Sequence, residues 1–103
     1  MIMYYVYIIY SEQYDKYYVG STRDPWKRLD KHNTSKFNTF TSKYRPWSLK
    51  VVFEAGVSMS DTENIKKFIK AQKSRTLLLK LIDKTFEPNG KLAQLVRVPH
   101  VRD

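Results

Sequence analysis

The chain has 103 residues and a formal net charge of +9, with 42% hydrophobic residues, 15% aromatic residues and no cysteine. These figures predict one small domain with its own core, and they exclude disulfides, thiolate metal sites and cysteine nucleophiles. The excess of basic and aromatic side chains favours a nucleic acid as partner, because phosphates attract cations and bases stack on aromatic rings. The lack of cysteine suits a cytoplasmic location, and no apolar stretch is long enough to predict a membrane span.

The first part of the chain predicts a β-hairpin followed by a helix. Residues 3–10, MYYVYIIY, are β-branched and aromatic, and residues 17–21, YYVGS, are typical of a second strand antiparallel to the first. Asp24-Pro25 combines an N-cap acceptor with proline at the first helical position, so we expect a helix over residues 25–33.

This expected helix carries two residues whose side chains are candidates for a role in chemistry. Trp26 and Leu29 are expected to face the core. Arg28 and His32 are four positions apart and therefore share one helix face. From the residues alone, that face is either an ordinary solvated surface or a pair suited to phosphate binding and proton transfer.

A long polar segment and a third strand follow. Residues 33–47 are rich in Asn, Thr, Ser and Lys without periodicity, and loops of this length in compact domains are often functional. The loop carries Lys43 and Arg45, which on charge alone we place on a surface that faces nucleic acid. Residues 49–55, LKVVFEA, predict the third strand.

Two further helices and a tail complete the predicted order. Ser60 or Asp61 is expected to cap the second helix, and Ser74 the third. The predicted fold class is α+β, with a small central three-stranded antiparallel sheet flanked by helices over residues 1–83. Residues 84–103 predict an extended basic tail, either laid over the domain or used on a partner.

Several kinds of site are missing from the sequence. There is no P-loop, no Gly-x-Ser-x-Gly motif and no His-Glu-x-x-His motif, so no nucleotide cofactor is expected. The tyrosines of the hairpin remain as candidates. A tyrosine takes up a proton only where neighbouring positive charge lowers its pKa from about 10, and buried or surface tyrosines without chemistry are the commoner case.

The ordered spacing of these motifs resembles the GIY-YIG nuclease superfamily, and in particular its small stand-alone bacterial members. The same domain forms the N-terminal nuclease half of an excinuclease, a DNA-repair enzyme. The similarity covers about residues 3–83, and it is carried by Tyr5-Val6-Tyr7, Tyr18-Val19-Gly20, Trp26-Lys27-Arg28-Leu29, Lys31-His32-Asn33, residues 41–47 and Lys73-Ser74-Arg75.

The resemblance implies metal-dependent hydrolysis of DNA phosphodiester bonds by a GIY-YIG endonuclease fold. Tyr7 and Tyr18 would be the signature tyrosines, one of which activates or positions the attacking water. Arg28 would hold the scissile phosphate, and His32 would assist proton transfer. Gly20 would allow a close backbone approach beside Tyr18 and so belong to the residues that bind nucleic acid.

The sequence departs from the family at the metal ligand, where the resemblance implies a glutamate on the second helix. Lys66 stands at that position. Either Glu63, one turn earlier, holds Mg²⁺ or Mn²⁺ instead, or the domain binds DNA without cutting it and Lys66 contacts a phosphate. Glu63 can equally be a first-turn acid that interacts with the helix dipole. A third interpretation is a protein-interaction module whose basic tail binds an acidic partner.

Overall fold

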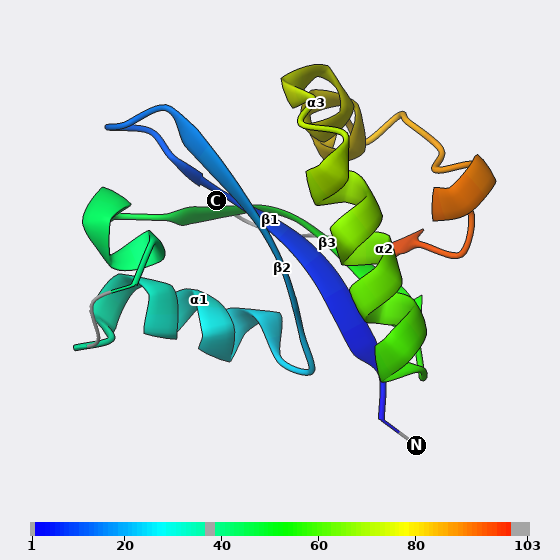
Figure 1. The fold of residues 1–103 in the computed structure, drawn as a ribbon, viewed down its shortest axis with the longest axis horizontal. Helices are drawn as coiled ribbons and strands as arrows, with labels where there is room; N and C mark the ends of the chain where they lie inside the picture. The colour runs from blue at the N-terminus through cyan, green and yellow to red at the C-terminus, as the bar shows by residue number, and fades with distance from the viewer. Residues whose placement is uncertain (1, 37–38, 100–103) are drawn as a thin grey trace.

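The fold is an α+β arrangement built on one antiparallel sheet. The computed structural model describes residues 2–36 and 39–99. The sheet has the strand order β2-β1-β3-β4 (Figure 1). Its strands are β1 (Tyr4–Ser11), β2 (Lys16–Thr22), β3 (Ser48–Gly56) and β4 (Val96–Arg97).

Within the described residues, three α-helices cover the sheet, α1 on one face and α2 and α3 on the other (Figure 1). They are α1 (Pro25–Thr34), α2 (Met59–Ala71) and α3 (Arg75–Ile82), with short 3₁₀ helices η1 (Thr41–Tyr44) and η2 (Gly90–Leu92). Within the described residues no helix is long and apolar enough to cross a membrane.

Each α-helix begins at a side-chain cap. Asp24 accepts a hydrogen bond from the Lys27 backbone N–H, and Ser74 caps α3 in the same way, as predicted. The expected cap of α2 at Ser60 or Asp61 is wrong. The cap is Ser58, whose hydroxyl accepts from the backbone N–H of Asp61, so the helix begins earlier.

The alternation of β1 sorts its side chains between two cores. Val6 and Ile8 lie in the core between the sheet and α2 and α3. Tyr7 and Ile9 lie in the core on the α1 face, where Leu29 packs against them. The expectation that Trp26 faces the core is wrong, because its side chain is 52% exposed.

The sheet has four strands, not the three predicted. The fourth, β4, comes from the C-terminal segment and pairs with β3, with Arg97 opposite Phe53. Leu92 and Leu95 of this segment are buried in the core beneath α2 and α3. The pattern did not predict the strand because only two residues form it and their pairing depends on contacts distant in sequence. Residues 100–103 of the predicted tail lie outside the described residues.

Candidate active site

A buried tyrosine–histidine pair joins β1 to α1. The Tyr7 hydroxyl and His32 Nε2 share a hydrogen bond of 2.7 Å, and His32 Nδ1 lies 2.9 Å from Thr41 Oγ1. Tyr7 is 1% exposed and His32 8%. The histidine is therefore held at both ring nitrogens, by the sheet on one side and by the start of η1 on the other.

Gly20 makes room for this pair. It lies opposite Tyr7 in the β1–β2 register, and the Tyr7 ring covers its backbone. A Cβ at position 20 would overlap the Tyr7 hydroxyl and lie 2.8 Å from Cε1 of the ring. Within the fold, the side chain that lies against Gly20 is thus that of Tyr7.

The loop after α1 is fixed to the end of that helix. Arg45 donates from Nε to the His32 carbonyl and from one terminal nitrogen to the Ser35 carbonyl, both at 2.6 Å. Asn33 and Trp47 exchange two hydrogen bonds, and the Trp47 indole donates to the Thr41 carbonyl. These contacts hold Thr41 against His32.

Both members of the buried pair are neutral at pH 7. Burial, followed by the positive charges of Arg28 and Arg45, lowers the pKa of His32 to about 4. Burial raises the pKa of Tyr7 far above its usual 10, with Tyr18 adding to the rise and Arg28 opposing it. Among the described residues the Tyr7 O–H has no other acceptor, so it donates to Nε2, and the single ring N–H of His32 donates from Nδ1 to Thr41.

The folded state should therefore become less stable as the pH falls, because protonation of His32 is unfavourable in the fold. Its pKa falls from 6.5 to about 4 on folding, so the unfolded chain binds more protons between these values. The free energy of unfolding should be about 2 kcal/mol lower at pH 5 than at pH 7 through this group. Urea unfolding at the two pH values measures it. His32→Gln should remove most of the difference, and an equal difference in that variant would contradict the assignment.

Arg28 and Tyr18 meet His32 at a surface pocket of 260 Å³. Arg28 is exposed on α1, and Lys31 adds a second cation to the pocket wall. The Tyr18 ring lies edge-on to the His32 ring, with centroids 5.2 Å apart. The structure thus brings Tyr18, Arg28 and His32 to one opening, with Tyr7 behind the histidine.

Glu63, on α2, lies beside Ser21, the residue that follows Gly20 in β2. Its Oε1 accepts a hydrogen bond from the Ser21 hydroxyl at 2.6 Å, and its Oε2 lies 2.7 Å from Lys66 Nζ. The hydrogen bonds from Lys66 and then from Ser21 lower the pKa of Glu63, so the carboxylate is ionised at neutral pH.

The donor set at Glu63 fits one kind of metal site only. No group of three or more His, Cys, Asp or Glu side chains gathers anywhere in the described part of the chain. Mg²⁺, however, is commonly held by one or two carboxylates together with substrate phosphates and water. An ionised, partly exposed carboxylate fits such a site, provided that Lys66 moves away from Oε2.

The sequence patterns indicated some of the residues that the structure brings together and gave no sign of others. They indicated Tyr7, Tyr18, Arg28 and His32, which the fold brings together. They gave no sign that Thr41 holds His32, because its role depends on a loop without periodicity. Two cations of that loop, both expected to face nucleic acid, differ in placement: Lys43 is exposed, whereas the Arg45 guanidinium is used on backbone carbonyls.

Comparison with known families matches the GIY-YIG catalytic domain to residues 3–77. No curated protein matches the chain. The matched span runs from β1 into α3 and includes Tyr7, Tyr18, Arg28, His32 and Glu63. The chain therefore belongs to the GIY-YIG family, whose catalytic domain is a nuclease domain acting on nucleic acid.

Proposed function

We propose that the protein is a cytoplasmic endonuclease that hydrolyses phosphodiester bonds of DNA. The observation that carries this proposal is the buried Tyr7–His32 hydrogen bond directly behind a surface pocket that holds Arg28 and Tyr18. His32 is held neutral between two polar partners next to an exposed arginine, an arrangement that suits both phosphate binding and proton transfer.

Arg28 is the proposed phosphate ligand. Its guanidinium presents paired donors that match two phosphate oxygens, and it remains charged at every relevant pH. Its position at the pocket mouth lets it hold the phosphodiester and stabilise the charge that develops on it. Lys31, from the same helix, adds to the positive potential.

The pair behind the pocket is the proposed proton acceptor. Burial is the main cause of the low pKa of His32, and the charge of Arg28 adds to it; a phosphate bound at Arg28 offsets that charge and so makes the imidazole a better base. As the water oxygen bonds to phosphorus, the water proton passes to the Tyr7 oxygen. The Tyr7 proton moves in turn to His32 Nε2. The ester P–O bond breaks, the leaving oxygen takes up a proton from solvent, and His32 later releases its extra proton to solvent. Tyr18, at the opening, orients the water.

Glu63 is the proposed ligand of Mg²⁺ or Mn²⁺. When bound, such an ion would withdraw charge from the phosphate oxygens. Lys66 competes with it for the same carboxylate oxygen. The affinity of the free protein for divalent metal should therefore be weak.

Removing either member of the Glu63–Lys66 pair should change metal affinity in opposite directions. Glu63→Gln should abolish the binding of free Mn²⁺, because it removes the anionic ligand. Lys66→Met should strengthen binding several-fold, because it removes a cation 2.7 Å from Oε2. Electron paramagnetic resonance of Mn²⁺ titrated with protein measures both. Equal Mn²⁺ affinity in all three proteins would rule out Glu63 as the ligand.

Incubation with branched, nicked and plain duplex DNA tests the proposed activity. Each substrate is offered with Mg²⁺, with Mn²⁺ and with chelator. Metal-dependent nicking supports the proposal. Salt-dependent binding without cutting under any metal would overturn it in favour of a domain that binds DNA, and the absence of any salt-dependent affinity would exclude both.

A further inference from the structure

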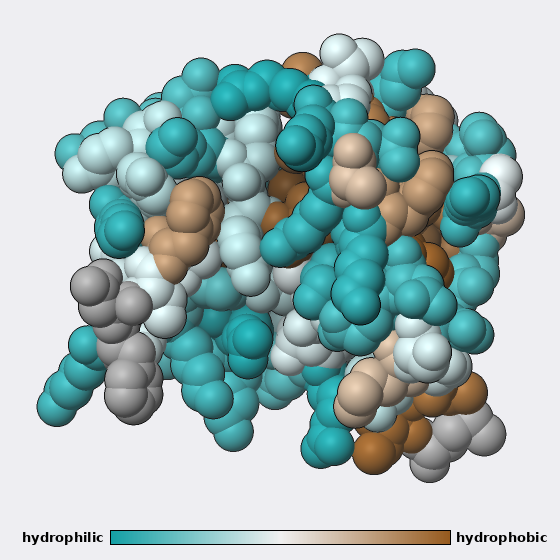
Figure 2. All heavy atoms as spheres, viewed as in Figure 1, coloured by the Kyte–Doolittle hydropathy of each residue, from teal (hydrophilic) through white to brown (hydrophobic). Residues whose placement is uncertain are grey.

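A second and larger pocket lies at the open edge of β2. It has a volume of 640 Å³, within the range of small-molecule sites. It is bounded by β2, by Phe40 just before η1, and by α2, α3 and the segment that joins them. Figure 2 shows a hollow at the place where β2 faces α2 in Figure 1, with apolar side chains inside and hydrophilic ones around it. Val19, Ile69 and Leu78 supply apolar lining.

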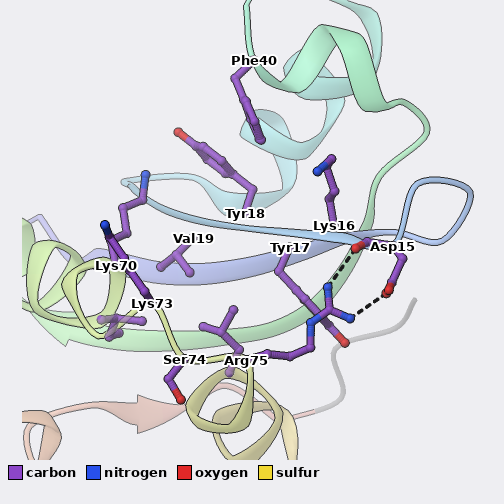
Figure 3. Close-up of a pocket in the computed structure, with 12 residues that line it drawn as sticks. Asp15, Lys16, Tyr17, Tyr18, Val19, Phe40, Lys70, Lys73, Ser74 and Arg75 are labelled. Atoms are coloured by element: carbon purple, nitrogen blue, oxygen red, sulfur yellow. Dashed lines mark hydrogen bonds and ion pairs between the residues drawn. The ribbon is translucent and has the colours of Figure 1, made fainter.

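Two aromatic rings at this pocket also line the active-site pocket. Tyr18 and Phe40 are shared by both, so the two openings adjoin. Their rings are nearly parallel, with an interplanar angle of 29° and centroids 6.2 Å apart (Figure 3). Phe40 is 50% exposed on a polar loop, where burial in the core does not explain it. An exposed aromatic face is the group that stacks with a base.

Cations line the rest of the pocket. Lys70 lies over the Tyr18 ring, with Nζ 4.4 Å from its centroid, and Lys73 follows at the end of α2 (Figure 3). Among the described lining residues Asp15 is the only acid, and it is already paired with Arg75 at 2.8 Å. Lys70 and Lys73 therefore give the pocket a net positive charge that complements phosphates.

We infer that this pocket binds an unpaired nucleotide of the strand whose phosphate lies at Arg28. The base stacks on Phe40 and Tyr18, while Lys70 and Lys73 contact the phosphates that flank it. The inference rests on the proposed function and adds a substrate class to it: DNA with an unpaired base next to the bond that is cut. A base paired within a duplex has no free face to offer these rings.

Binding experiments in the presence of chelator measure nucleotide binding at this pocket without DNA cleavage. The probes are a labelled single-stranded 12-mer, the same strand with one central abasic site, and the corresponding blunt duplex, each followed by fluorescence anisotropy. The intact strand should bind about tenfold more tightly than the abasic strand, the size expected for one stacked base. It should also bind more tightly than the duplex at equal salt.

Phe40 variants test whether the base stacks at this pocket. Phe40→Ala should bind the intact and abasic strands equally, and Phe40→Trp should restore the tenfold difference. Lys73→Ala should weaken both strands to the same extent. Lys80→Ala, which removes one positive charge from the exposed face of α3, should lower affinity less than Lys73→Ala does.

Two results would overturn the inference while leaving the proposed function intact. One is equal binding of intact and abasic strands by the unaltered protein. The other is an abasic penalty that survives Phe40→Ala. In either case, metal-dependent cutting that requires Arg28 would still support the proposed nuclease activity. If the protein showed the abasic penalty but cut no DNA with any metal, only the proposed nuclease activity would be overturned.

Discussion

Arg28→Ala should reduce DNA cleavage by about two to three orders of magnitude in kcat. Arg28 lies at the pocket mouth beside His32 and Tyr18, and in the proposed reaction its charge acts on the phosphate as negative charge develops. Binding should fall much less, because the chain carries 19 lysine and arginine residues in all. Single-turnover cleavage of a labelled substrate, together with anisotropy in chelator, measures the two effects separately.

Two matched variants define the control. Arg28→Lys keeps the charge but loses the paired donors, so it should recover only part of the rate. Arg23→Ala removes the same charge from an exposed position just before α1 and should cut at close to the normal rate. If Arg28→Ala and Arg23→Ala lost the same small amount of activity, Arg28 would be one basic residue among many and not a ligand of the scissile phosphate.

The hairpin and the first helix were predictable because their signals are local. Alternation along β1 is enough to place Tyr7 and Ile9 on one face, and the spacing of Arg28 and His32 is enough to place them together on α1. Local rules fail where the structure depends on distant contacts. The strand β4 exists only through its pairing with β3, and Thr41 reaches His32 only because Arg45 and Trp47 fix the loop.

The two signature tyrosines illustrate the same limit. The sequence presents Tyr7 and Tyr18 alike, as members of neighbouring strands. In the fold Tyr7 lies in a central strand beneath α1, whereas Tyr18 lies in the edge strand β2 and is partly exposed at two pockets. Strand order, which is a tertiary property, therefore places Tyr7 in the core and leaves Tyr18 partly exposed.

Gly20→Ala tests whether the Tyr7–His32 hydrogen bond depends on the space that Gly20 leaves for the Tyr7 side chain. The new Cβ would overlap the Tyr7 hydroxyl, and a ring held by a packed core cannot move away without strain. The free energy of unfolding should fall by about 2 kcal/mol. As the Tyr7–His32 hydrogen bond breaks, the pKa of His32, followed by NMR titration, should shift from its value near 4.

A double-mutant cycle with Tyr7→Leu identifies the cause. Without the aromatic ring, the added Cβ at position 20 meets little, so Gly20→Ala in the Tyr7→Leu background should cost less than about 0.5 kcal/mol. The coupling energy would then be about 1.5 kcal/mol, measured by urea unfolding of the four proteins. Additive effects would mean that the glycine is needed for the backbone of β2 itself. Non-additive effects would show that Gly20 of β2 and Tyr7 of β1 act together. Position 20 would then be a glycine because the Tyr7 side chain must pass over it to reach His32.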